Sequence, residues 1–83
     1  MSAIHQFVHF GFDIGSISIN TVVMDDDRNI LENRYDLCHG RPFEQLLRIL
    51  KELEIKYPPG RVRLIGLTGT GGKLAHTLIG GHY

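Results

Sequence analysis

One short stretch near the start of the chain, residues 7–16, most limits what this sequence can fold into. Phe10, Phe12 and Ile14 alternate there with small or acidic residues, which predicts a β-strand with one apolar face and one bare face. The stretch ends in Asp-x-Gly-Ser. Because glycine lets a backbone approach a ligand closely, this end suits a phosphate or its hydrated metal ion. An ordinary Asp-x-Gly turn explains the same residues equally well.

The remaining pattern predicts an α/β domain with a mixed sheet. Residues 17–24 and 30–38 alternate and favour strands, so the first three strands form an antiparallel meander joined by tight turns. Helical spacing runs over about 42–57, beginning at a proline that is tolerated in the first turn. The apolar segment 62–67 then follows a helical crossover, which predicts a fourth strand parallel to the first.

The same periodicity predicts which side chains share a face. In the second strand one face carries Ile17, Ile19, Thr21 and Val23. In the third strand Leu31, Tyr35 and Leu37 alternate with Glu32, Arg34 and Asp36. Along the helix the apolar positions are Phe43, Leu46, Leu47, Leu50, Leu53 and Tyr57. Tyr35 and Tyr57 are expected at the edge of the core, and Glu44–Arg48 and Glu52–Lys56 as ion pairs along the helix.

A glycine-rich turn follows the fourth strand, at the sheet end where open α/β proteins bind ligands. Residues 68–73 read Thr-Gly-Thr-Gly-Gly-Lys. A phosphate-binding P-loop would need glycine at position 67 and serine or threonine at position 74, where this chain has Leu67 and Leu74. A dinucleotide-binding fingerprint would need glycine or alanine at position 74, so neither pattern is present. The turn is expected to lead into a short helix over about 71–79, with backbone amides able to face an anion.

Composition narrows the class of protein. The chain has 83 residues, nine basic and nine acidic, so it carries neither a nucleic-acid nor an anionic-membrane footprint. Cys38 is the only cysteine, which excludes an internal disulfide and favours a reducing cytoplasm. No apolar run approaches the ~20 residues that a membrane-spanning helix needs. These features predict a soluble cytoplasmic domain.

The order of elements, with Asp-x-Gly-Ser between the first two strands, resembles the ribonuclease H-like half of the sugar kinase, heat-shock chaperone and actin superfamily. Within it, residues 11–16 and 66–71 are similar to the ATPase activators of 2-hydroxyacyl-CoA dehydratases and benzoyl-CoA reductases, also called CoA-substrate-specific enzyme activases. The resemblance spans residues 7–83. In that family two such halves clasp ATP, and a cysteine-held [4Fe-4S] cluster bridges two protomers to pass an electron to the partner enzyme.

The resemblance implies a role for each matching residue. Asp13 would be the catalytic residue and would hold magnesium through water. The nucleotide-binding positions would be Gly15, Ser16, Ile17, Thr68, Gly69 and Gly71. Asn20 stands where members often carry lysine. The chain contains no ligands for the cluster, which would belong to the parent protein.

The function expected from this resemblance is that of the N-terminal lobe of an ATP-binding or ATP-hydrolysing activator. Residues 1–83 would form one subdomain of a longer two-lobed ATPase domain, inactive in isolation, whose parent drives electrons to a CoA-ester dehydratase or reductase. The main alternative is a non-catalytic interaction or dimerisation module of the same fold. Another actin-like kinase, or a ribonuclease H-like nuclease with Asp13 as a metal ligand, is less favoured.

Overall fold

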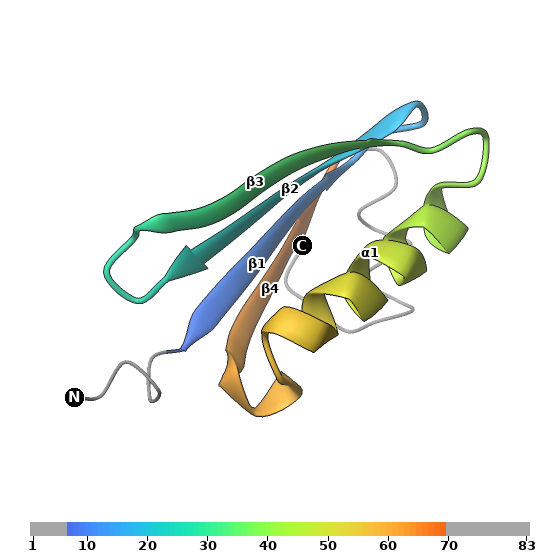
Figure 1. The fold of residues 1–83 in the computed structure, drawn as a ribbon. Helices are drawn as coiled ribbons and strands as arrows, with labels where there is room; N and C mark the ends of the chain where they lie inside the picture. Colours follow the sequence, from blue (N-terminus) through green and yellow to red (C-terminus); the bar gives the residue numbers. More distant parts are fainter. Residues whose placement is uncertain (1–6, 70–83) are drawn as a thin grey trace.

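The computed structural model describes residues 7–69, which form a four-stranded mixed sheet with one helix packed on it (Figure 1). The strand order is β3-β2-β1-β4; β1 runs antiparallel to β2 and parallel to β4, and β2 runs antiparallel to β3. In chain order the elements are β1 (Val8–Ile14), β2 (Ser18–Asp25), β3 (Ile30–Leu37), α1 (Pro42–Lys56), a 3₁₀ turn (Pro59–Arg61) and β4 (Val62–Thr68). The α/β class, the antiparallel meander, the long helix and the parallel fourth strand are therefore confirmed.

Helix α1 covers one face of the sheet, and the core lies between them (Figure 1). The apolar face of β1 points there: Phe10 packs edge-on against Phe12 and against Tyr57, with ring centroids 6.1 and 6.0 Å apart. These contacts confirm Tyr57 as an aromatic of the core edge. The buried apolar side chains are Val8, Phe10, Phe12, Ile14, Ile19, Val23, Cys38, Leu46, Ile49, Leu53 and Leu67.

Strand β3 turns its charged face, and not its apolar face, toward α1. Leu31, Tyr35 and Leu37 are 44%, 62% and 46% exposed, so the expectation that Tyr35 lies at the core edge is wrong. The physical reason is the polar flank of α1, which supplies partners for the charged row of β3. The Arg34 guanidinium bonds to Asp36 (Nε–Oδ2, 2.8 Å) and to Glu52 of α1 (Nη2–Oε1, 2.9 Å).

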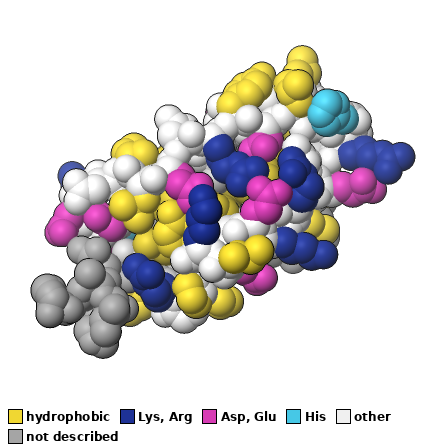
Figure 2. All heavy atoms as spheres, in the orientation of Figure 1, with side chains coloured by type: hydrophobic (Ala, Val, Ile, Leu, Met, Phe, Trp, Pro, Cys, Tyr) yellow, Lys and Arg dark blue, Asp and Glu magenta, His cyan; other side chains and the backbone are white. Residues whose placement is uncertain are grey.

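Interleaved acidic and basic side chains are visible between α1 and β3 (Figure 2). The expected pairs along the helix, Glu44–Arg48 and Glu52–Lys56, do not form. Lys56 reaches Glu32 on β3 instead (3.1 Å), while Arg48 bonds to Glu52 (2.9 Å). Long side chains on α1 can reach β3, and charges brought there from distant parts of the sequence compete with neighbours one turn away.

Two further apolar expectations are corrected by the structure. Ile17 is 70% exposed because it lies in the turn before β2 rather than on its buried face, whereas Ile19, Thr21 and Val23 are buried as expected. Leu47 is 54% exposed, and Ile49 takes its place in the core. The apolar stripe of α1 is therefore centred on Leu46, Ile49 and Leu53.

The aspartate-rich turn between β2 and β3 is closed by its first aspartate. The buried Asp25 carboxylate accepts hydrogen bonds from the backbone N–H groups of Asp27 and Asn29, both at 2.9 Å. The Asn29 contacts, followed by the one from Asp27, hold the pKa of Asp25 below its ordinary value against the opposing effect of burial. The turn is thus explained by hydrogen bonds among its own residues.

Candidate functional site

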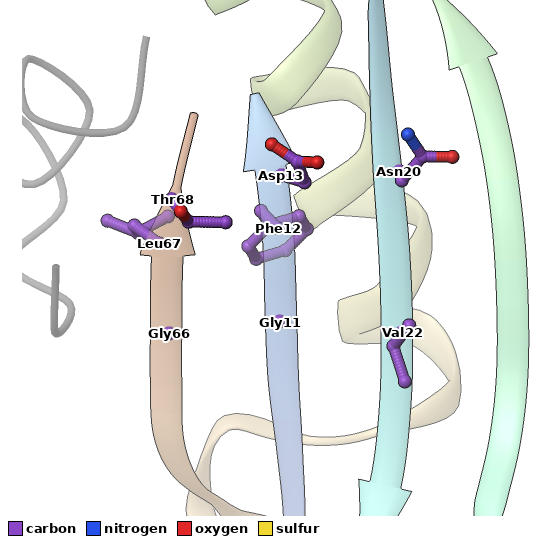
Figure 3. Close-up of a pocket in the computed structure, with 8 residues that line it drawn as sticks. All are labelled: Gly11, Phe12, Asp13, Asn20, Val22, Gly66, Leu67 and Thr68. Atoms are coloured by element: carbon purple, nitrogen blue, oxygen red, sulfur yellow. The ribbon is translucent and has the colours of Figure 1, made fainter. Parts of the chain in front are cut away.

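The face of the sheet opposite α1 carries the candidate site, and two glycines open it. Gly11 of β1 lies beside Gly66 of β4 in the parallel register, with Val22 of β2 on the other side. They line a shallow cavity of about 370 Å³, whose labelled residues come from β1, β2 and β4 (Figure 3). Because neither glycine carries a side chain, a ligand or another segment can come close to the backbone at this point.

Asp13 stands at the end of this cavity, where the strands finish. Its register partners are Asn20 on β2 and Thr68 on β4, and all three are exposed (Figure 3). Within residues 7–69 the carboxylate has no ion-pair or hydrogen-bond partner. An unpaired carboxylate between an amide and a hydroxyl is a group of oxygen donors that suits a hydrated magnesium ion. A two-metal nuclease site would need a second acid beside Asp13, and both flanking positions are neutral.

In the turn after β1, one backbone N–H group is hydrogen-bonded within the hairpin, and two others have no acceptor among the described residues. The Gly15 N–H donates to the Ser18 carbonyl oxygen at 2.9 Å, so it closes the hairpin and does not face a ligand. Ser16 and Ile17 are exposed, and their N–H groups find no acceptor within the described part of the chain. These two amides and the Ser16 hydroxyl are the donors that the turn offers.

Gly69, in the glycine-rich turn after β4, lies against the Asp-x-Gly-Ser segment at the end of β1. Its φ is +88°, in the left-handed region that glycine favours. A Cβ placed there would lie 2.5 Å from the Ile14 carbonyl oxygen and 2.6 Å from Asp13 Oδ1. The turn after β4 therefore passes directly against the end of β1, so Thr68 and Gly69 lie beside Asp13. Gly71 and the expected helix over about 71–79 lie outside the described residues.

Cys38 makes a contact that the sequence patterns did not predict. Its N–H donates to the Ile17 carbonyl oxygen at 2.7 Å, and its thiol lies 3.8 Å from the Gly15 carbonyl oxygen. Burial, followed by the negative charge of Asp36, raises the pKa of the thiol. Cys38 thus ties the end of β3 to the turn after β1 as a packed, neutral side chain. Its only sequence signal is its place as the last apolar residue of the third predicted strand.

One ionisable pair lies at the far end of β1 from this site. His9 and Asp26 pair across the β1–β2 ladder with Nε2 and Oδ1 2.8 Å apart, at the opposite end of β1 from Asp13. Residues 7–69 contain no group of three or more His, Cys, Asp or Glu side chains arranged to hold a metal ion. A magnesium ion at Asp13 would therefore share its coordination with water and with its ligand, which fits the way magnesium binds.

Comparisons of the chain with protein-family models, with curated proteins and with solved structures give no match. The resemblance to the activase family therefore stays a prediction from the residues.

Of the helices in the described residues, none is long and apolar enough to cross a membrane.

Proposed function

We propose that this chain is the N-terminal lobe of an ATP-binding activator with a ribonuclease H-like topology, related to the activases of 2-hydroxyacyl-CoA dehydratases and benzoyl-CoA reductases. The supporting observation is the close approach of Gly69 to the end of β1, where a Cβ on Gly69 would come within 2.6 Å of both Asp13 Oδ1 and the Ile14 carbonyl oxygen. Two glycine turns that lie far apart in the sequence thus flank one unpaired carboxylate. Outward backbone N–H groups beside a carboxylate suit a metal-bound phosphate.

Each residue of the proposed site has a distinct role. Asp13 would orient a hydrated magnesium ion, which supplies the positive charge that neutralises the terminal phosphates. The N–H groups of Ser16 and Ile17, which find no acceptor among the described residues, would donate to phosphate oxygens together with the Ser16 hydroxyl. Thr68 and Gly69 would form the opposite wall of the site. Asn20 contributes an amide and no charge, so phosphate binding would depend on the metal ion.

The parent protein would provide the other parts of this function. A second lobe would supply the remaining phosphate and nucleoside contacts, and its closure would exclude water from the reaction. The iron–sulfur cluster, the CoA-ester enzyme as partner and the cytoplasmic location all belong to this proposal. Residues 1–83 alone are expected to bind ATP weakly and to hydrolyse it very slowly.

Equilibrium binding of ATP to the 83-residue chain tests the proposal. We expect weak binding that needs magnesium and that Asp13→Asn abolishes. Asp27→Asn is the matched control, because Asp27 is an exposed aspartate in the β2–β3 turn. Binding that persists in Asp13→Asn, that ignores magnesium, or that reaches submicromolar affinity would contradict the proposal.

A further inference from the structure

Within residues 7–69, strand β3 is an outer strand of the sheet, and its backbone is open on one side. In the order β3-β2-β1-β4 it pairs with β2 alone among the described residues (Figure 1). An unpaired edge offers a row of N–H and C=O groups to another strand. Which residues offer them follows from the ladder that β3 makes with β2.

Two backbone hydrogen bonds fix the pairing phase of the sheet. The Gly15 N–H donates to Ser18, so on β2 the even-numbered residues face β1. The odd-numbered residues of β2 therefore face β3, in agreement with the bond from the Cys38 N–H to the Ile17 carbonyl oxygen. Through the register Ile19↔Asp36 and Thr21↔Arg34, the even-numbered residues of β3 are bonded to β2. The N–H and C=O groups that point outward are those of Asn33, Tyr35 and Leu37.

The two faces of β3 carry different kinds of side chain, mainly apolar on one and charged on the other. Tyr35 and Leu37 stand exposed on the face away from α1, while Arg34 and Asp36 lie on the α1 side, where Arg34 bonds to Asp36. An antiparallel copy of this strand would present the same rows in reverse order. A symmetric contact is favourable when apolar groups meet on one face and opposite charges meet on the other.

We propose that the chain associates with a second copy through antiparallel pairing of β3, with the twofold axis at Tyr35. In this register the outward groups of Tyr35 bond to those of Tyr35 in the second copy, and Asn33 pairs with Leu37. Arg34 then lies opposite Asp36 of the second copy, so the internal ion pair becomes an alternating set of four charges. The two tyrosines meet across the axis, and the two sheets become one continuous sheet.

The neighbouring registers are less favourable for reasons visible in the strand. An axis at Arg34 would place Arg34 against its own copy and Glu32 against Asp36, so like charges would face each other. An axis at Asn33 would require regular pairing at Leu31, where the ladder with β2 is interrupted between its pairs with Glu32 and Ile30. Charge and regularity together favour the axis at Tyr35 over these two registers. The association is independent of nucleotide, because β3 contributes nothing to the site at Asp13.

Light scattering of the full 83-residue chain over a range of concentrations tests this pairing. A dimer is expected, with dissociation in the micromolar range or above because the contact is small. Tyr35→Lys places two like charges at the axis and is expected to weaken association at least about tenfold. Leu64→Lys, at an exposed position of the opposite edge strand β4, is the matched control and should leave association within about twofold.

Cysteine cross-linking tests the register. Directly opposed residues in a hydrogen-bonded pair have Cα atoms about 5.5 Å apart, which a disulfide can span. Under mild oxidation Tyr35→Cys is expected to give a covalent dimer, and Asn33→Cys is not; the buried Cys38 of the unmodified chain serves as the background. A chain that stays monomeric, a dimer disrupted by Leu64→Lys but not by Tyr35→Lys, or cross-linking at Asn33 alone would each overturn the proposal.

Discussion

On the face of the sheet that α1 covers, β1 contributes Phe10, Phe12 and Ile14, each at most 5% exposed. On the other face the same strand contributes Gly11 and Asp13, which line an open cavity. The two sets alternate along seven residues, so one strand both anchors the core and carries the candidate site. The difference shows that the buried neighbours Phe12 and Ile14 hold Asp13 in place, while the Asp13 side chain itself stays exposed.

The largest expected effect is a difference in the free energy of unfolding between substitutions on the two faces of β1. Phe12→Ala removes a fully buried ring between the sheet and α1, and should lower the free energy of unfolding by about 3–5 kcal/mol. Asp13→Ala removes an exposed side chain that has no partner within residues 7–69, and should change the free energy of unfolding by less than about 0.5 kcal/mol. Urea denaturation of both variants measures the contrast. Comparable losses would show that Asp13 is a structural residue and not a carboxylate free to bind a ligand.

A second contrast lies among the glycines of the open face. Gly69→Ala forces a side chain into a left-handed backbone position and against Ile14, and should lower the free energy of unfolding by about 1–3 kcal/mol. Gly66→Ala is the control, because its Cβ would come no closer than 3.9 Å to another atom, the Phe10 carbonyl oxygen. Both are measured by chemical denaturation. Equal stability of the two variants would remove the evidence that the turn after β4 is held against β1.

The charges on the covered face are expected to matter less than its apolar groups. Arg34→Met breaks bonds to Asp36 and Glu52 and should cost about 1–2 kcal/mol, with a smaller loss in high salt. Arg41→Met removes a pair with Glu44 in which both side chains are at least 70% exposed, and should cost about 0–0.5 kcal/mol. Denaturation of both variants at low and high salt makes the comparison. A larger loss for Arg41→Met would contradict the assigned network.

The last expected effect is confined to alkaline pH. Burial, reinforced by the hydrogen bond to Glu32, raises the pKa of Tyr57 from 10.0 to about 12. A raised pKa means that the native state favours the neutral phenol, so this contribution is complete below about pH 10 and is lost as pH rises toward 12. The difference in unfolding free energy between the natural chain and Tyr57→Phe should therefore shrink over that interval. A pH-independent difference would contradict the raised pKa of Tyr57, and with it the buried, hydrogen-bonded environment assigned to its phenol.

Much of the fold follows from local patterns in the sequence. Strict alternation in β1, helical spacing from Pro42 and the crossover to β4 each depend on the segment's own residues, and all three are confirmed. The buried face of β3 could not be assigned this way, because its apolar and charged rows alternate equally well. Its orientation was decided by the polar flank of α1, whose Glu52 lies 18 residues from Arg34.

The position of the candidate residues at one end of the sheet was predictable, and the contacts among them were not. Asp13, Ser16, Ile17, Thr68 and Gly69 do gather at one end of the sheet, as parallel pairing of β1 with β4 requires. The internal use of the Gly15 N–H depends on how the hairpin closes, and the position of Cys38 depends on where β3 ends against that hairpin. Both are set by tertiary packing, which a local pattern does not contain.

The most direct test of a nucleotide site at Asp13 is amide NMR of the 83-residue chain during titration with ATP and magnesium. We expect magnesium-dependent shifts that are largest at the amides of Ser16 and Ile17, accompanied by Gly69, and absent in Asp13→Asn. The Gly15 amide, which is bonded to Ser18, should shift less than its two neighbours. No shift at this turn at millimolar nucleotide, or shifts centred on another part of the chain, would contradict the assignment of Asp13 and its flanking turns as a nucleotide site.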